Sequence, residues 1–168
     1  YGIAKSEEVS DDGLGRTYKL RKDAKWDNGD PVTAHDFVYA WYRIFKNKGN
    51  YYYMFADGIA SIQGAQELSD KIDVGEELTD DDLNSMGVKA LDGYTLEVKT
   101  TVRVSFLDEL LAFPPFYPIN EKFAEKQGSK YGKSAKTILG NGAFKMINLE
   151  PGSVAEFKKM KTIMIKNM

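Results

Sequence analysis

The sequence predicts an α+β fold in which a small, mostly antiparallel sheet packs against helices. Short stretches of alternating apolar and charged residues are typical of half-buried strands, and one long stretch with apolar residues three and four positions apart is typical of a helix. Turn sequences rich in Asp, Gly and Pro separate these stretches. The chain has 168 residues, 42% of them hydrophobic and 29% charged, which predicts a single globular domain in water.

The first predicted strand covers residues 17–21, where apolar Tyr18 and Leu20 alternate with charged residues. The Asp-Asp-Gly turn at 11–13 precedes it, so we expect a short edge or hairpin strand. The turn at 27–31 contains Gly and Pro and breaks the chain again. Trp26 is therefore predicted to end this strand.

A helix is predicted to begin after Thr33, because Thr33 and Asp36 have the spacing of a capping box. Five apolar residues then recur at helical spacing and define one buried stripe. They are Phe37, Val38, Trp41, Ile44 and Phe45.

The middle of the chain predicts a second helix over residues 59–68 and a single helical turn behind a capping box at 79–82. Residues 88–99 are typical of a hairpin around an Asp-Gly turn. A two-residue loop would set Val88 against Glu97. A three-residue loop over 92–94 with a bulge pairs Val88 with Val98 and Ala90 with Leu96, and we favour it because the apolar residues then share one face.

The last third predicts a short helix over 106–111 and an extended, proline-rich path over 113–118. Asn120 is expected to cap a helix that ends at Gly128. A second hairpin follows, with strands at 143–147 and 154–158.

Charge and composition exclude several functions. The 23 basic and 25 acidic residues are spread along the chain for a net charge of −2, so we predict no nucleic-acid partner. Without cysteine there is no disulfide, thiolate metal site or cysteine nucleophile. The first eight residues have no apolar run and do not resemble a signal peptide, so the start is interpreted as a cut into a longer protein.

The sequence gives only weak signals for catalytic or metal-binding residues. His35 lies in the first turn of the predicted helix, where the dipole disfavours an imidazolium, and we expect it to be exposed and structural. The acidic runs lack the spacing of a calcium loop, and the glycine pairs at 13–15 and 140–142 fail the nucleotide-binding patterns. We predict no cofactor and no metal. Paired carboxylates of a hydrolase have no marker in the sequence, and this alternative stays open.

The aromatic run at 50–55, Asn-Tyr-Tyr-Tyr-Met-Phe, is the most distinctive candidate for binding. Consecutive tyrosines cannot all face one core, so at least one ring should reach the surface. Tyrosine combines a rigid apolar face with a polar tip and suits contact with a ligand backbone. The alternative is that these rings only cover the end of the first helix.

Several long segments resemble the oligopeptide-binding proteins of bacterial ABC importers, the extracellular solute-binding proteins of family 5. These segments are "YKLRKDAKWDNGDPVTAHDFVYAW", "YYYMFADGI", "GVKALDGYTLEVK", "LLAFPPFYPINEKFAEKQGSKYG" and "NGAFK". The similarity runs over residues 3–159 and covers about a third of such a protein. It implies the inserted subdomain of a type II periplasmic-binding-protein-like fold.

The resemblance also implies a function. Members of the family are extracytoplasmic, as periplasmic proteins or cell-surface lipoproteins, are not enzymes, use no cofactor, and pass oligopeptides to an ABC permease. One tyrosine just after the first helix of the subdomain approaches the peptide, and the matching residue here is Tyr51, or Tyr53 if the loop is shifted. The chain is thus expected to supply part of one wall of the peptide cleft and not to bind alone. A stand-alone interaction module derived from the receptor is the alternative.

The resemblance divides the chain into a subdomain at 1–159 and an atypical tail at 160–168. The tail reads MKTIMIKNM, whereas the family continues with Lys-Asn and an aromatic-Asp motif. One codon set allowed for residues 158–168 spells that motif in another reading frame, so we expect a frame error and a frayed tail. The last strand would then lack its neighbours, and strand-mediated homo-oligomers become possible.

Overall fold

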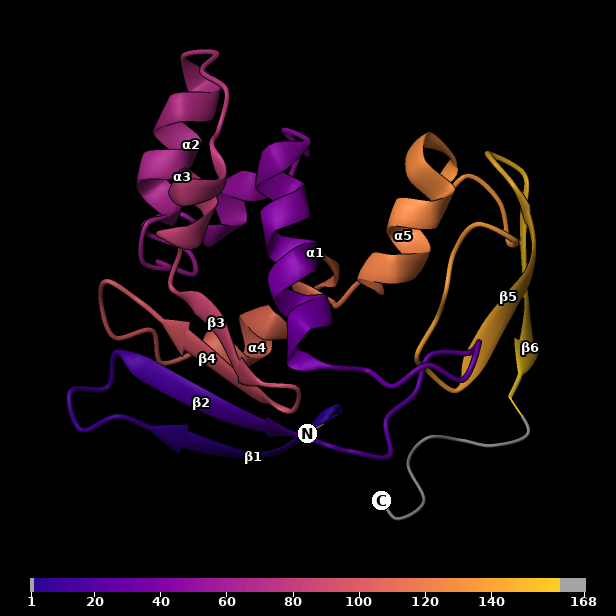
Figure 1. Cartoon of the computed structure of the whole chain (residues 1–168), viewed down its shortest axis with the longest axis horizontal. Helices are drawn as coiled ribbons and strands as arrows, with labels where there is room; N and C mark the ends of the chain where they lie inside the picture. The colour runs from indigo at the N-terminus through magenta and orange to yellow at the C-terminus, as the bar shows by residue number, and fades with distance from the viewer. Residues whose placement is uncertain (1, 161–168) are drawn as a thin grey trace. The chain divides into compact units, whose positions relative to one another are not determined.

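A computed structural model describes residues 2–160 (Figure 1). The chain divides into two compact units, one made of residues 1–20 and 33–118 and the other of residues 21–32 and 119–168. Except for Met160, the predicted tail lies outside the described residues. The division into 1–159 and 160–168 therefore stays a prediction, while the mixed α+β fold with small antiparallel sheets is confirmed.

The first unit contains a four-stranded antiparallel sheet in the order β1-β2-β4-β3. Its strands are β1 (Ala4–Val9), β2 (Gly15–Leu20), β3 (Val88–Asp92) and β4 (Thr95–Lys99). The predicted strand with buried Tyr18 and Leu20 is present as β2. Of the two expected positions, edge or hairpin strand, the hairpin is confirmed: β2 pairs with β1, and β4 pairs with its other side.

The register of the β3–β4 hairpin is the predicted one, with Val88 opposite Val98 and Ala90 opposite Leu96. The extra residue that sets this register is a bulge between Ala90 and Asp92, and Asp92 pairs with Thr95. Val88, Leu96 and Val98 are all buried. The apolar alternation therefore decided the register, as expected for a sheet with one buried face.

Helix α1 (Ala34–Lys46) lies against β3 and β4 (Figure 1). The predicted capping box is present, with the Thr33 amide donating to the Asp36 carboxylate at 2.8 Å. Trp41 and Phe45 are fully buried, as predicted. Phe37, Val38 and Ile44 are only half-buried, so the predicted stripe is fully buried only at Trp41 and Phe45. The small residues Ala34 and Ala40 are buried instead and let the helix approach its neighbours closely.

Helix α2 (Ala65–Asp73) begins six residues later than predicted. Gly64 stands at its N-cap with a left-handed backbone (φ 76°), where a side chain would strike the Ser85 carbonyl oxygen at 2.9 Å. The apolar Ile62 is buried, but in a bridge to Thr100 and not in the helix. Glycine at a reversal, and not the apolar spacing, sets the start of the helix.

Helix α3 (Asp80–Asn84) is the predicted single turn behind a capping box. Asp82 accepts hydrogen bonds from the Lys71 ammonium, the Thr79 amide and the Thr79 hydroxyl. The Lys71 bond, followed by the two Thr79 bonds, lowers the pKa of Asp82 from 3.8 to about 2. The carboxylate is thus favoured in the folded chain.

We expect Asp82 to make folding stability depend on pH in acid. Because the folded pKa is depressed, its contribution is present above about pH 4 and is lost as the pH falls from about 4 to about 2. Asp82→Asn should flatten the loss of stability in that window, measured by urea unfolding at several pH values. Asp81→Asn in the same turn controls for the lost charge, and equal profiles for the two variants would contradict the prediction.

Helix α4 (Leu107–Leu111) confirms the short helix after residue 106. The proline-rich path is not fully extended, because Pro114–Phe116 form a 3-10 turn, η2. Phe113 and Tyr117 on either side of the turn are extended. The fixed φ of proline suits the first position of a helical turn as well as an extended chain, and this explains the difference.

The second unit contains helix α5 (Glu121–Gln127), the 3-10 turn η3 (Gly128–Lys130), and the predicted hairpin as β5 (Phe144–Glu150) and β6 (Val154–Lys159). The Asn120 side chain caps α5 by accepting from the Phe123 amide at 2.8 Å, as predicted. Trp26 does not end β2, which stops at Leu20. It is buried in this unit, where its amide donates to the Asp30 carbonyl across the 27–30 turn.

Over residues 2–160, the helices are all too short or too polar to cross a lipid bilayer.

Candidate functional site

The tyrosine run follows directly on the end of α1. Lys48 adopts a left-handed backbone (φ 49°) and the Gly49 amide donates to the Ile44 carbonyl, so the chain reverses there. Tyr52–Phe55 then form a 3-10 turn, η1. Tyr51 and Tyr53 are 55% and 51% exposed, so the expectation that at least one ring reaches the surface is confirmed.

The other two aromatic residues of the run face the protein. The Tyr52 ring lies 6.1 Å from that of Phe45, so it covers the end of α1, and its hydroxyl donates to Asp73. That hydrogen bond raises the pKa of Tyr52. Phe55 is fully buried. The two interpretations of the run therefore apply to different residues: Tyr52 closes the helix end, while Tyr51 and Tyr53 are available to a ligand.

Phe55 fixes the turn η1 to the core. Its ring centroid lies 4.5 Å from that of Phe116, 5.2 Å from that of Trp41 and 5.5 Å from that of Phe45. The Ile62 amide donates to the Phe55 carbonyl at 2.8 Å. The exposed tyrosines thus stand on a base that is held by both side-chain packing and backbone bonds.

The turn η2 contacts η1 in the core and, like η1, has a fully buried ring with exposed aromatic residues nearby. Phe116 is buried against Phe55, and the Trp41 indole donates to the Phe116 carbonyl at 3.1 Å. On its two sides, Phe113 and Tyr117 are 55% and 51% exposed.

Sequence reasoning did not name Phe113 and Tyr117 as candidates. The signal was present, since Phe-Pro-Pro-Phe-Tyr-Pro at 113–118 is a second aromatic cluster. Both clusters contain a 3-10 turn with one fully buried ring, Phe55 or Phe116, and two exposed rings nearby. Recognising the turn at 114–116 would have predicted which rings are exposed.

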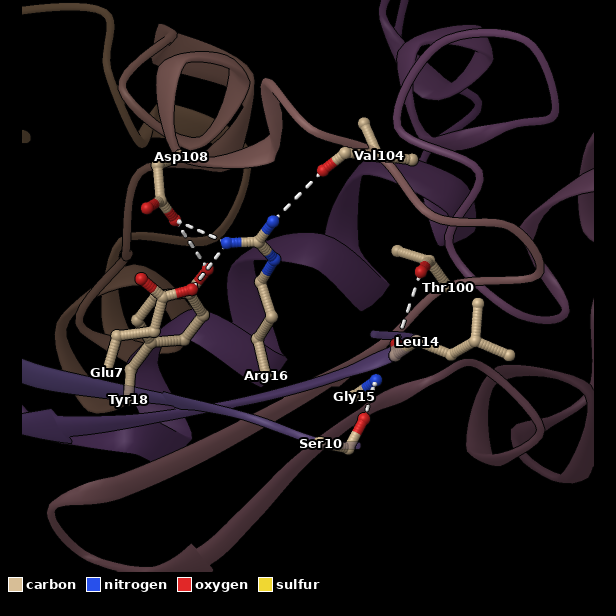
Figure 2. Close-up of polar contacts among 9 residues, drawn as sticks. All are labelled: Glu7, Ser10, Leu14, Gly15, Arg16, Tyr18, Thr100, Val104 and Asp108. Atoms are coloured by element: carbon tan, nitrogen blue, oxygen red, sulfur yellow. Dashed lines mark hydrogen bonds and ion pairs between the residues drawn. The ribbon is translucent and has the colours of Figure 1, made fainter. Parts of the chain in front are cut away.

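A partly buried polar network holds the segment that leads to η2 (Figure 2). Arg16 forms an ion pair with Glu7, lies 3.6 Å from the Asp108 carboxylate, and donates to the Val104 carbonyl at 3.0 Å. Tyr18 donates to Asp108 at 2.8 Å. Burial, and then this hydrogen bond, raises the pKa of the Tyr18 hydroxyl, so it stays a donor. The network ties β1, β2 and α4 together.

The network also bears on the hydrolase alternative. Glu7 and Asp108 are two carboxylates brought together by the fold, but the Arg16 guanidinium lies between them and pairs with both. One guanidinium thus engages both carboxylates, and the Asp108 carboxylate also accepts from the Tyr18 hydroxyl at 2.8 Å. The arrangement is that of a structural clamp.

A hollow of about 410 Å³ lies beside the β1–β2 turn. The turn is fixed by the Gly15 amide, which donates to the Ser10 hydroxyl at 2.7 Å, and by the Thr100 hydroxyl, which donates to the Leu14 carbonyl at 3.1 Å (Figure 2). Charges of both signs line it, and Glu97 and Lys99 are paired at 3.3 Å. The lining is mixed: Glu8, Asp12 and Glu97 are acidic, Lys99 is basic, and Val9 and Leu14 are apolar, so the hollow does not select one class of ligand.

The remaining candidates do not converge on a site. His35 is exposed at the start of α1, as predicted. Across residues 2–160, no three acidic or histidine side chains gather as they would around a metal ion. Tyr51 and Tyr53 therefore remain the candidate binding residues, and Phe113 and Tyr117 are further exposed aromatic residues of the same unit.

Comparison with known proteins identifies relatives over nearly the whole chain. The Haemophilus influenzae periplasmic oligopeptide-binding protein OppA is 35% identical over 158 residues, which cover 94% of this chain and 28% of the relative. The Bacillus subtilis oligopeptide-binding protein OppA is 34% identical over 182 residues, with 99% and 31% covered.

Solved structures agree with these relatives. The substrate-binding domain of an oligopeptide ABC transporter from Bacillus anthracis matches with a TM-score of 0.80 and 40% identity, over 94% of this chain and 29% of that one. Haemophilus influenzae OppA in complex with the peptide RPPGFSPFR matches with a TM-score of 0.78. These proteins are named as binding proteins and not as enzymes. The chain spans less than a third of their length.

Residues 1–162 match the family described as bacterial extracellular solute-binding proteins, family 5, middle. The predicted resemblance is thereby confirmed: this chain belongs to the family 5 bacterial extracellular solute-binding proteins.

Proposed function

We propose that the chain forms part of one wall of the peptide cleft in the receptor of an oligopeptide ABC importer. The observation that carries the proposal is the exposure of Tyr51 and Tyr53 on a turn fixed by buried Phe55. Rigid, half-exposed tyrosines lose little conformational entropy when they contact a ligand. Because their main contribution is a flat apolar face, they suit peptides of varied sequence.

The proposal includes the setting of the complete receptor. It would act outside the cytoplasm, as a periplasmic or cell-surface lipoprotein, and would hand its peptide to an ABC permease. It needs no cofactor and catalyses no reaction. The periplasmic name of one relative and the ABC transporter name of another support this setting.

The isolated chain should bind peptides weakly. A cleft gains affinity by enclosing its ligand, and one wall makes only part of the contacts. Losing about 5 kcal/mol of contacts converts a micromolar ligand into one with a dissociation constant of about 1 mM or weaker. Calorimetry with a pool of four- and five-residue peptides should therefore detect no micromolar binding. A micromolar constant would instead favour the stand-alone interaction module.

The proposed surface can be tested at millimolar peptide by NMR. Added peptide should change the chemical shifts of residues 51–53. In a Tyr51→Ala/Tyr53→Ala variant the peptide-dependent shift changes should be about threefold smaller, because two aromatic contacts are removed. Val74→Ala is the matched control, since Val74 is 74% exposed in the same unit but lies at the C-cap of α2. If the tyrosine substitutions leave the peptide-dependent shift changes unaltered, or if Val74→Ala reduces them equally, the result argues against this surface.

A further inference from the structure

The segment that carries the exposed tyrosines is tied to the end of helix α2. The Tyr52 hydroxyl donates to the Asp73 carboxylate. The Lys48 ammonium donates to the Glu77 carboxylate at 2.9 Å. Helix α2 also contacts the turn η1 directly, and all of these residues belong to the first unit. Two side-chain bonds therefore join the segment after α1 to the segment where α2 ends.

Tyr52 stands between the two candidate binding residues. Tyr51 and Tyr53 are exposed, whereas Tyr52 is half-buried with its ring against Phe45. Because Phe45 is fully buried, the core holds the ring of Tyr52 and Asp73 holds its hydroxyl. The three tyrosines are consecutive, so fixing the middle one limits the orientations that both neighbours can adopt.

The position of Asp73 is unfavourable for its own helix. It is the last residue of α2, where the helix dipole disfavours a negative charge. Glu76 and Glu77 follow within four residues and add further negative charge. Across residues 2–160, Asp73 has no ion-pair partner, and its side chain accepts a hydrogen bond from Tyr52. A residue that breaks a local rule of its helix is best explained by the partner that it holds outside the helix.

We propose that Asp73 is a positioning residue for the peptide-binding surface. Through the Tyr52 hydroxyl it holds Tyr51 and Tyr53 in the orientation that they present to a peptide. This inference rests on the proposed function of the two exposed tyrosines. A ring that is already fixed loses less conformational entropy on binding than a mobile one, so Asp73 raises affinity without contacting the peptide.

The test begins with NMR relaxation of the 168-residue chain in the absence of peptide. Asp73→Ala and Tyr52→Phe each remove the hydrogen bond, and Tyr52→Phe retains the ring that packs on Phe45. Both substitutions should lower the backbone order parameters of residues 51–53 by a similar amount. The double variant should lower them no further, because the two single variants lose the same bond.

Two further variants separate the hydrogen bond from the loss of a charge. Asp73→Asn should retain most of the order at residues 51–53, because the amide oxygen still accepts from the Tyr52 hydroxyl. Glu67→Ala is the matched control, since Glu67 is an exposed carboxylate of the same helix. It should leave these order parameters unchanged.

The second measurement adds four- and five-residue peptides at millimolar concentration. The peptide-dependent shift changes of residues 51–53 should be about twofold smaller in Asp73→Ala and Tyr52→Phe, because the rings are no longer fixed before binding. Asp73→Asn should restore them. The thermal unfolding temperature of Asp73→Ala should stay the same or rise, because an acid is removed from the unfavourable end of α2. A weaker peptide response without a loss of stability distinguishes positioning from general destabilisation.

The outcomes separate this inference from the proposed function. Unchanged order parameters in both Asp73→Ala and Tyr52→Phe would overturn the positioning role, as would an equal loss of order in Glu67→Ala. A peptide response that both single variants leave intact would also overturn the positioning role while the proposed function stands. If the unmodified chain shows no peptide response at residues 51–53, the proposed function is wrong and the positioning role is rejected with it.

Discussion

Trp41→Ala is expected to lower the free energy of unfolding by about 3–5 kcal/mol, the usual cost of emptying a large aromatic site in a core. Trp41 is 1% exposed and makes edge-to-face contacts with Phe55 and Phe116. The substitution also leaves the Phe116 carbonyl without its indole donor, which adds the cost of a buried unpaired acceptor. Urea titration followed by circular dichroism measures the loss.

Phe37→Ala in the same helix is the matched comparison. Phe37 is half-buried, so less apolar area returns to water and about half the loss or less is expected. Trp41→Phe should fall between the two, because it retains much of the packing but loses the hydrogen bond. If Phe37→Ala lowers the free energy of unfolding as much as Trp41→Ala does, the core has been assigned to the wrong face of α1.

Trp41 also connects the core to the candidate surface. It contacts the inward ring of each 3-10 turn, Phe55 in η1 and Phe116 in η2. The exposed residues beside those turns therefore depend on one buried side chain. Trp41→Ala should broaden the NMR signals of Tyr51, Tyr53, Phe113 and Tyr117 even where the chain stays folded.

Local sequence signals predicted the elements whose geometry is set by neighbouring residues. The capping boxes at Thr33 and Thr79 and the Asn120 cap are each satisfied within three residues along the chain. The register of β3 and β4 follows from apolar alternation over one short hairpin. Such signals need no knowledge of the rest of the fold.

Signals that depend on distant residues were missed. Strand β1 is mostly polar and pairs with β2. Strand β2 becomes interior only because β4, about 80 positions later in the chain, lies on its other side. The start of α2 depends on the approach of Gly64 to the Ser85 backbone. No periodicity in the sequence contains these long-range contacts, which is why it left edge and hairpin positions open for β2 and gave the wrong start for α2.

The candidate surface was predicted in part for the same reason. The tyrosine run predicted that at least one ring is exposed, and the family resemblance indicated Tyr51, or Tyr53 if the loop is shifted. The exposure of Phe113 and Tyr117 emerges only from the structure. The Arg16 network was not foreseen either. Its members come from β1, β2 and the segment at 104–108, up to 101 positions apart.

Arg16→Met is the second substitution with a large expected effect, about 3 kcal/mol of unfolding free energy. The Arg16 and Glu7 side chains are 14% and 11% exposed, so removing the guanidinium leaves a nearly buried carboxylate without its counter-charge. The Val104 carbonyl loses its donor as well. Lys19→Met is the matched control, because Lys19 is an exposed cation on the opposite face of the same strand. It should cost less than about 1 kcal/mol.

A double-mutant cycle separates the ion pair from simple loss of packing. If the cost of Arg16→Met arises from the unpaired Glu7 carboxylate, Arg16→Met/Glu7→Met should be more stable than Arg16→Met alone, since the buried charge is gone. We expect at least about 1 kcal/mol of recovery in urea titration at pH 7. Additive costs of Arg16→Met and Glu7→Met, with no recovery in the double variant, would show that Arg16 acts through its packing and its bond to Val104, and not as the counter-charge of Glu7.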